Sequence, residues 1–310
     1  MEHHFKVGAE DAGKRIDLFL AEELKKDGSS RSFLKQLILN KGVLLNNQPV
    51  KPHHKLRIQD SVKVNIPELP TAGITAEEIS LKIIYEDSDI LVIDKPAGLV
   101  VHPGAGNQSG TLVNALLAHT ANLSSINPRR PGIVHRLDKE TSGVMVIARN
   151  NTAHLNLAEQ FSAHTIKRAY VALVSGSMEL DEGLIDLPIG RHKKDFRRQS
   201  VSFVHSKNAL TRYKVLKRFA KATFLELIPE TGRTHQLRVH LAHLGHPILG
   251  DAKYGRKSDF IRLALHAREL GFLHPRKSKF VSFQSELPPA FNNFIKMEQS
   301  GSTRKSLVAL

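Results

Sequence analysis

The chain has 310 residues, 41% of them hydrophobic, so it can bury one large core and carry a second, smaller domain. It contains no cysteine, which excludes disulfide bonds, a thiolate nucleophile and a cysteine-ligated metal. It has neither a long apolar run nor an amino-terminal signal layout, so we expect a cytoplasmic protein that does not enter a membrane. The formal net charge of +15 favours a polyanionic partner.

Basic residues are concentrated in one stretch, from Arg191 to Arg218. This stretch holds ten basic residues and one acidic residue, Asp195, which leaves a net charge of +9. A solvated loop also carries charge, but so many like charges repel one another unless phosphates neutralise them. We therefore expect the stretch to contact nucleic acid, with Lys207 among the contacts.

The first part of the chain reads as a small unit after a short leader. Residues 1–12 show no regular pattern and are predicted to be a loose leader, whereas 13–67 predict a compact unit of helices and short strands. The predicted elements are a helix from Ile16 to Leu24, a helix that follows Ser30 and ends at Gly42, strands at Val43–Leu45 and Ser61–Asn65, and a turn at Asn46–Asn47.

A polar stretch that contains proline and glycine, 68–80, predicts a linker to a larger domain over 81–297. The larger domain opens with two apolar runs, 81–85 and 90–93, which indicate a hairpin. Because strands and helices then mix without a regular alternation, the pattern favours an α+β fold with a mixed, largely antiparallel sheet. Residues 298–310 are polar and are expected to form a flexible tail.

Two helices of the larger domain can be placed from their ends. Thr111 is a predicted N-cap, and a second helix is predicted from Thr234 to Leu244, with Thr234 as its N-cap and Gly245 just past its end. On this second helix Arg238 lies away from the apolar face, so its guanidinium is free to reach a carboxylate. A solvated helix arginine is the ordinary alternative.

The polar segment His135 to Gly143, HRLDKETSG, lies between two apolar segments, 132–134 and 144–148, that are both predicted to be strands. Such a layout holds polar side chains on a rigid base at a sheet edge. Asp138 has Arg136 and Lys139 as sequence neighbours, which should keep its carboxylate ionised and usable as a nucleophile or base. The residues alone favour a simpler interpretation, a loop aspartate that bridges cations or caps a turn.

The segment HRLDKETSG resembles the catalytic signature of the pseudouridine synthases that modify large-subunit ribosomal RNA, the RluA/RluD type. Other segments between about residues 82 and 284 resemble further motifs of that family, in the same order. They are KPAG at 95–98 with VHP at 101–103, KRAYVA at 167–172, TGRTHQLRVHL at 231–241, GHPILGD at 245–251 with YG at 254–255, and LHA at 265–267 with FLHP at 272–275. The unit at 13–67 resembles the S4 RNA-binding domain through KRID at 14–17, Ser30–Arg31 and KGVLLN at 41–46.

The resemblance implies a pseudouridine synthase fold of the α+β class, preceded by a small S4-like α+β domain that binds RNA. It implies an isomerase that flips a uridine out of RNA, with 23S ribosomal RNA as the expected substrate, and converts it into its C-glycoside isomer. No cofactor, metal or membrane partner is expected, and we expect a monomer. Open questions are which uridine is modified, whether ribosomal or transfer RNA carries it, whether assembled particles are needed, and whether attack is at C1′ or C6.

The resemblance also assigns roles to residues. Asp138 would be the nucleophile, Arg238 would form a salt bridge to it, and Tyr170 would stack on the uracil, although the strand pattern around Tyr170, taken alone, favours a core residue. Arg136 would fill the space that the flipped base leaves. The expected contacts with RNA or the target base are His135, Arg136, Thr141, Arg233, His235, Gln236, Lys95 and Lys207, with Arg31 and Lys35 in the S4-like unit.

Three alternatives compete with this interpretation. A metal-dependent hydrolase is suggested by the histidines at 235, 240, 243 and 246, although no His-Glu-x-x-His motif is present. A glycosidase would also use paired carboxylates, but the chain has no tryptophan to form a sugar platform. A non-catalytic RNA-binding or ribosome-assembly factor would use the S4-like unit and the basic stretch without converting a base.

Overall fold

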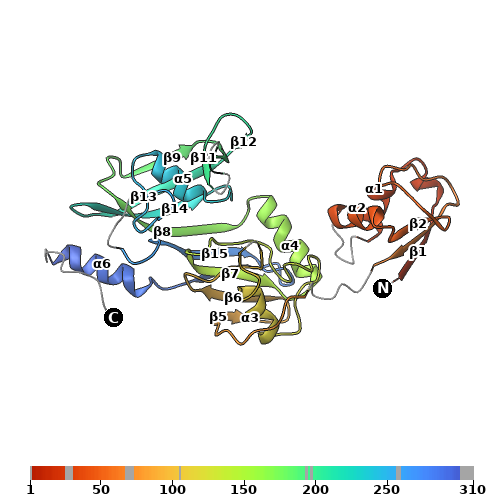
Figure 1. Cartoon of the computed structure of the whole chain (residues 1–310), viewed down its shortest axis with the longest axis horizontal. Coiled ribbons are helices and arrows are strands. Elements are labelled where there is room, and N and C mark those ends of the chain that lie inside the picture. Colours follow the sequence, from red (N-terminus) through yellow and green to blue (C-terminus); the bar gives the residue numbers. More distant parts are fainter. Residues whose placement is uncertain are drawn as a thin grey trace.

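The computed structural model describes residues 2–24, 31–66, 73–104, 106–192, 195, 198–255 and 260–300. Within these ranges the strands form sheets of four, nine and three strands, and helices cover the two larger sheets (Figure 1). The helices are η1 (Ala9–Asp11), α1 (Ile16–Glu23), α2 (Arg31–Leu39), α3 (Leu112–His119), α4 (Asn151–Ser162), α5 (Gln236–His243) and α6 (Pro289–Gln299). No helix in the described ranges is both long and apolar enough to cross a membrane.

The amino-terminal unit is a four-stranded sheet with α1 and α2 packed on it. Its strands run in the order β1-β4-β2-β3, and they are β1 (Glu2–Lys6), β2 (Val43–Leu45), β3 (Gln48–Pro49) and β4 (Ser61–Asn65). The two helices, the strands at 43–45 and 61–65 and the turn at Asn46–Asn47 are as predicted. The loose leader is wrong, because all five residues of β1 pair with β4 and Val7 is buried in the core of the unit.

The predicted linker is shorter on its carboxyl side than the sequence suggests. Residues 67–72 lie outside the described ranges, but Thr75 and Glu77 are already held against α3. The Asn114 amide donates to the Thr75 carbonyl over 2.7 Å, and the Glu77 carboxylate accepts from the backbone N–H of Gly110. Asn114 also accepts from the backbone N–H of Thr111, which caps α3 as predicted.

The central sheet has nine strands in the order β5-β6-β7-β15-β8-β14-β13-β9, with β16 added beside β15. Its strands are β5 (Lys82–Glu86), β6 (Ile90–Lys95), β7 (Ser142–Ala148), β8 (Lys167–Ser175), β9 (Glu182–Asp186), β13 (Leu210–Arg218), β14 (Ala222–Pro229), β15 (Leu265–Leu273) and β16 (Phe280–Gln284). Only the pairing of β7 with β15 is parallel, so the described sheet is mixed and largely antiparallel, as predicted. The predicted hairpin is β5 with β6.

Alternating side chains of the central strands serve two cores, one on each face of the sheet. On β6, Ile90 and Val92 pack with α4, whereas Leu91 and Ile93 pack with α3. Every residue of β7 is buried for the same reason, since both faces are covered. Leu137 belongs to the α3 core and is 4% exposed, so it anchors the loop that carries Asp138.

The strand β7 begins with a close backbone approach to β15. Gly143 has a φ of +117°, and a Cβ atom there would lie 2.1 Å from the carbonyl oxygen of Ala267. Only glycine allows this approach. The strand predicted at 132–134 is wrong, because this segment makes a single bridge between Ile133 and Ile147.

The other half of the sheet packs against α5 and α6. Leu237 and Leu241 of α5 join a core with β8, β13 and β14. The predicted cap of α5 is wrong: His235, in the left-handed region with φ 58°, precedes its first residue in place of Thr234. Gly245 lies just past the helix end, as predicted. The predicted tail is wrong at its start, because residues 298 and 299 belong to α6, and 301–310 lie outside the described ranges.

A three-stranded sheet is inserted between β9 and β13. It consists of β10 (Ile189–Arg191), β11 (Gln199–Val201) and β12 (Ser206–Lys207), with β10 in the middle. Ile189 and Val201 pack with Val239 of α5 and with Tyr254. The inserted sheet is therefore fixed to the helix that carries Arg238.

Candidate active site

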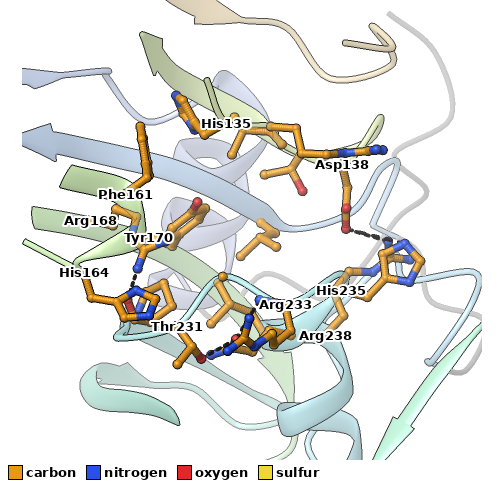
Figure 2. A pocket seen from close by; sticks show the side chains of 18 of the residues that line it. His135, Asp138, Phe161, His164, Arg168, Tyr170, Thr231, Arg233, His235 and Arg238 are labelled. Carbon is orange, nitrogen blue, oxygen red and sulfur yellow. Dashed lines mark hydrogen bonds and ion pairs between the residues drawn. The ribbon is translucent and has the colours of Figure 1, made fainter. Parts of the chain in front are cut away.

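A cleft of about 590 Å³ lies where the Asp138 loop, β8 and the start of α5 meet. Figure 2 shows Asp138, His235 and Arg238 on one side of it and Phe161, Arg168 and Tyr170 on the other. The predicted site residues that line it are His135, Arg136, Asp138, Thr141, Tyr170, Arg233, His235, Gln236 and Arg238. The sheet thus brings together residues far apart in the chain, such as Asp138 and Arg238, which are separated by 100 positions.

Asp138 is held by one charged hydrogen bond. Its Oδ2 accepts from Nη1 of Arg238 over 3.0 Å, which is the salt bridge that the sequence analysis expects. The Asp138 side chain remains 21% exposed toward the cleft, while that of Arg238 is 9% exposed. Among the described residues, Oδ1 of Asp138 accepts no hydrogen bond, so this oxygen is available to a bound molecule.

Arg238 is itself fixed by a second carboxylate. Asp251 is buried and accepts from both Nε and Nη2 of Arg238, each over 2.8 Å. Burial alone would lower the pKa of Arg238, but the hydrogen bonds and charges of Asp251 and Asp138 raise it above its usual value. Burial alone would likewise raise the pKa of Asp251, and Arg238 with the backbone N–H groups of Lys253 and Tyr254 lowers it. The guanidinium therefore stays charged beside Asp138.

His235 faces the same carboxylate, and a chain of two hydrogen bonds on the far side of its ring sets its orientation. The backbone N–H of Gln199 donates to the Tyr254 hydroxyl over 2.8 Å, so the proton of that hydroxyl can point to Nδ1 of His235, 2.7 Å away. The ring proton is thereby assigned to Nε2, which lies 3.8 Å from Oδ2 of Asp138. Burial lowers the pKa of His235, so the ring is neutral near pH 7.

Tyr170 forms the opposite wall of the cleft. It is half-buried on β8, and burial raises the pKa of its phenol, an increase that Arg168 opposes and the negative charge of Asp138 reinforces. Arg168 is held in place because its Nη2 donates to the carbonyls of Pro229 and Glu230, each over 3.1 Å. The wall thus offers an aromatic face beside a fixed cation.

His135 lines the cleft as a neutral ring. It stacks on Phe161 with 4.5 Å between ring centroids, and its Nε2 accepts from the backbone N–H of Val146 over 3.1 Å. Burial, helped by the charge of Arg168, lowers the pKa of His135 to about 3. The ring supports the Asp138 loop and cannot act as a cation at neutral pH.

Thr141 and Arg136 lie on either side of Asp138 in sequence and differ in exposure. Thr141 is 2% exposed, and its buried hydroxyl has no hydrogen-bond partner among the described residues although it lines the cleft. A buried hydroxyl without a partner is costly, so a bound molecule that bonds to it would gain affinity. Arg136 is exposed at the cleft.

Lys95 was expected to contact RNA, but its side chain makes its contacts within the protein. Lys95 is fully buried, and its ammonium donates to the carbonyls of Pro96, Leu99 and Lys139 over 2.8 to 3.0 Å. Contact of Lys95 with RNA is therefore wrong: it ties its own loop to the Asp138 loop, and burial lowers its pKa to about 8.

Gln236 lines the cleft, but its amide is used within the protein. Its Oε1 accepts from the Thr231 hydroxyl and from the backbone N–H of Arg233, and its Nε2 donates to Leu210 and Thr211 of β13. It holds the loop before α5 in place of the expected contact with RNA.

The remaining predicted contacts lie in several places. Arg233 lines the cleft and donates from Nε to the carbonyl of Asn208. Lys207 is exposed on β12, and Lys35 is exposed on α2; neither lines the cleft. The side chain of Arg31 lies outside the described part of the structure, as do Lys193, Lys194 and Arg197 of the basic stretch.

Three of the four histidines that suggested a metal site, at positions 235, 240 and 246, have separate hydrogen-bond partners. His240 is buried and bonds to Thr211 and to the carbonyl of Leu187, while His246 bonds to the carbonyl of Ser175. Among the described residues, the group with metal-ligand spacing is Asp87, Asp89 and His274. Its carboxylates already pair with Arg276 and Lys277, so cations of the chain neutralise it.

The sequence analysis missed residues behind the cleft and residues that line it. Asp251 and Tyr254, which hold Arg238 and His235 from behind, stand in motifs that carried the family resemblance, but no role was assigned to them. Phe161, His164 and Arg168 line the cleft itself. Arg168 lies in the KRAYVA segment two residues before Tyr170, so strand alternation could have placed it on the same face as Tyr170.

Comparison with known proteins identifies the class. A family model described as RNA pseudouridylate synthase matches residues 89–243, and one described as S4 domain matches residues 14–62. The uncharacterised RNA pseudouridine synthase YlyB of Bacillus subtilis (strain 168) is 47% identical over 283 residues, which cover 90% of this chain and 92% of YlyB. The ribosomal large subunit pseudouridine synthase D of Xanthomonas campestris pv. campestris is 41% identical over 313 residues, 96% of this chain and 93% of the relative.

A solved structure agrees. Human RNA pseudouridylate synthase domain containing 1 has a TM-score of 0.57 and 28% sequence identity, over 69% of this chain and 86% of that chain. The chain therefore belongs to the RNA pseudouridine synthase family, with an S4 domain ahead of the synthase region. It is an enzyme of the isomerase class, as the resemblance implies.

Proposed function

We propose that this chain converts a uridine of large-subunit ribosomal RNA into pseudouridine, with Asp138 as the nucleophile. The observation that carries the proposal is the Asp138 carboxylate at the wall of the cleft, aligned by Arg238, which Asp251 clamps from behind. The substrate class is supported by relatives named ribosomal large subunit pseudouridine synthase D, which are 40–44% identical to this chain.

The target uridine would have to leave its stack to reach Asp138. A base held in an RNA helix hides its glycosidic bond, and extruding it costs a few kcal/mol of stacking and pairing. The exposed Arg136 is suited to fill the space that the base leaves, and Tyr170 is suited to stack on the uracil in the cleft. The unpartnered hydroxyl of Thr141 can bond to the base or to Asp138.

The reaction then balances without a co-reactant. Oδ1 of Asp138 attacks either C1′ of the ribose or C6 of the uracil, and the N1–C1′ bond breaks. The uracil turns, a bond forms between C5 and C1′, Asp138 is released, C5 loses its proton and N1 gains one. The product is an isomer of the substrate, so no cofactor or metal is needed.

Asp138, Arg238 and Tyr170 line one cleft of a single chain, so one copy holds the three side chains that the proposed reaction uses. Work on ribosomal RNA would place the enzyme in the cytoplasm, where the sequence analysis expects it. A glycosidase receives no support, because the second carboxylate, Asp251, is buried behind Arg238 and cannot reach a sugar.

The test uses the hydrogen that is lost from C5. RNA transcribed with [5-³H]uridine releases tritium into water on conversion, and the full chain should release it from a large-subunit ribosomal RNA transcript. Asp138→Asn and Asp138→Ala should release none while binding the same RNA with nearly unchanged affinity. Near-normal release by both variants would overturn the assignment of Asp138.

The same assay separates the alternative. Binding of the transcript by the wild-type chain without tritium release, from naked RNA and from ribosomal particles alike, would favour a non-catalytic RNA-binding or assembly factor. Mapping pseudouridine in ribosomal and transfer RNA from cells with and without the gene would identify the modified uridine and the class of RNA that carries it.

A further inference from the structure

The inserted three-stranded sheet carries an apolar tip in water. The tip loop, residues 202–205, joins β11 to β12 across the end of β10 and projects from the body of the protein (Figure 1). Phe203 is 79% exposed, the highest value among the large apolar side chains of the described residues, and Val204 is 64% exposed. Because Phe203 and Val204 are neighbours, the tip presents two adjacent exposed apolar side chains, and contiguous apolar surface is the kind that marks interaction sites.

The conformation of the tip loop is fixed by the chain itself. The Ser202 hydroxyl accepts from the backbone N–H of Val204 and donates to its carbonyl, and the Ser202 N–H donates to Pro188 over 3.0 Å. The loop crosses directly above Gly190, where a Cβ atom would lie 3.1 Å from the carbonyl oxygen of His205. The structure therefore holds Phe203 outward on a defined turn.

The base of the same sheet is tied to the cleft. Gln199 at the start of β11 donates to the Tyr254 hydroxyl, which bonds to His235 beside Asp138. Arg198 lies over the Tyr254 ring, 5.1 Å from its centroid. A molecule that contacts the tip loop is thus held in a fixed position relative to the cleft.

The charge around the tip loop indicates which molecule that is. The sequence from Ile189 to Lys207 contains six basic residues and one acidic residue, and Arg191 and Lys207 are exposed. An aromatic ring among cations matches single-stranded or distorted nucleic acid, where phosphates neutralise the cations and a base stacks on the ring. A second copy of the chain would bring the same positive charge and be repelled.

We propose that Phe203 stacks on an unpaired base of the RNA substrate outside the cleft, so that the tip loop and the cleft grip one RNA at two points. The inference rests on the proposed function for the identity of the RNA. It adds a residue that determines RNA affinity and that no motif of the family resemblance contains.

Substitution of Phe203 tests the stacking. Phe203→Ala should weaken binding of a large-subunit ribosomal RNA transcript about tenfold, the range that removal of one stacked aromatic ring gives. Tritium release at saturating RNA should keep its rate. Phe203→Tyr should retain the affinity and Phe203→Leu should not, since an aliphatic side chain cannot stack. Leu180→Ala is the matched control, because Leu180 is 67% exposed in the turn between β8 and β9 and should have no effect.

The chain contains no tryptophan, so Phe203→Trp introduces a single fluorescent reporter. In the Asp138→Asn background, addition of the transcript should quench the fluorescence of Phe203→Trp until binding saturates. The fluorescence of Leu180→Trp should change little. Equal responses at the two positions, or wild-type affinity of Phe203→Ala, would overturn the inference.

A loss of self-association in Phe203→Ala, measured by sedimentation without RNA, would also overturn it and assign the tip loop to contacts between copies. If the transcript quenches Phe203→Trp but the wild-type chain releases no tritium, the proposed function is refuted and the stacking stands. If the wild-type chain releases tritium but Phe203→Trp is not quenched, the stacking is refuted and the proposed function stands.

Discussion

Asp251 and Asp138 share the guanidinium of Arg238 unequally. Asp251 accepts two hydrogen bonds of 2.8 Å and is fully buried, whereas Asp138 accepts one of 3.0 Å and faces the cleft. Bidentate pairing fixes the plane of a guanidinium, so Asp251 sets the direction in which Nη1 points. The buried carboxylate aligns the exposed one through the arginine between them.

Asp251→Asn should therefore reduce turnover although Asp251 cannot touch the substrate. Its amide group would offer a donor to the guanidinium in place of an acceptor, and breaking one partner of a buried ion pair costs about 3–5 kcal/mol of stability. We expect tritium release under single-turnover conditions to fall about a hundredfold, equivalent to about 2.7 kcal/mol in the barrier. Asp181→Asn removes an exposed partner of Arg218 and should change neither the rate nor urea unfolding. Wild-type turnover of Asp251→Asn would contradict the alignment.

Tyr254→Phe should test the proton on His235. Without the hydroxyl, the backbone N–H of Gln199 loses its acceptor and Nδ1 of His235 loses its donor. The ring proton is then no longer confined to Nε2, the nitrogen that faces Asp138. We expect the turnover rate to fall about tenfold, the effect of one lost hydrogen bond of about 1.4 kcal/mol, with an unchanged KM for RNA.

Tyr85→Phe is the matched control for Tyr254→Phe, since the Tyr85 hydroxyl bonds to Asp87 outside the cleft. It should leave turnover intact. A higher KM with normal turnover in Tyr254→Phe would show that the tyrosine serves RNA binding instead of the histidine.

His135 should make the protein sensitive to acid. The folded protein keeps the ring neutral because burial lowers its pKa to about 3, while the unfolded chain takes up a proton below the ordinary pKa of 6.5. Stability is thus unaffected by this ring above about pH 6.5 and falls as the pH drops toward 3, by about 2 kcal/mol at pH 5.

Urea unfolding of the wild type and of His135→Gln at pH 7 and pH 5 checks this acid sensitivity. Glutamine cannot take up the proton, so the variant should lose less stability between the two pH values. Equal losses in both proteins would show that other histidines dominate, and His154→Gln is the matched comparison, because burial lowers the pKa of His154 to about 4.

Gly143→Ala should be far more damaging than alanine at another glycine of positive φ. Gly143 and Gly245 have φ values of +117° and +83°, so both substitutions strain the backbone by about 1–2 kcal/mol. At Gly143 the new methyl group also meets the Ala267 carbonyl, and β7 would have to move away from β15. At Gly245 no atom lies within 4 Å. Comparable melting temperatures of the two variants would contradict the close approach.

The strands with strong alternation and the capped helices could be predicted from the sequence. The hairpin of β5 and β6 and the cap at Thr111 depend on neighbours in the chain, so local patterns describe them. The strand β1 could not be predicted, because its five residues are stabilised by pairing with β4, about 60 positions later. Thr234 has good cap chemistry, but Oε1 of Gln236 accepts from the backbone N–H of Arg233 in the loop before α5, and the N-cap lies one residue later, at His235.

The site could be predicted where a family motif marks it and not where burial decides. Asp138 and Arg238 stand in two motifs, so the resemblance predicts their pairing, whereas residue patterns alone left Asp138 as a loop carboxylate. Lys95 reads as a surface cation because lysine is rarely buried. Its burial depends on three carbonyls from two loops that only the folded sheet brings together.

The single parallel pairing of the sheet determines when the enzyme becomes competent during its synthesis. The strand β7 follows the Asp138 loop in the chain, and its partner β15 ends at Leu273. The ribosome must therefore make almost the whole chain before β7 and β15 can pair. The amino-terminal unit needs only residues up to Asn65 for its four strands. A nascent chain can therefore complete its S4 domain long before the cleft exists, and RNA capture can precede catalytic ability in the life of each molecule.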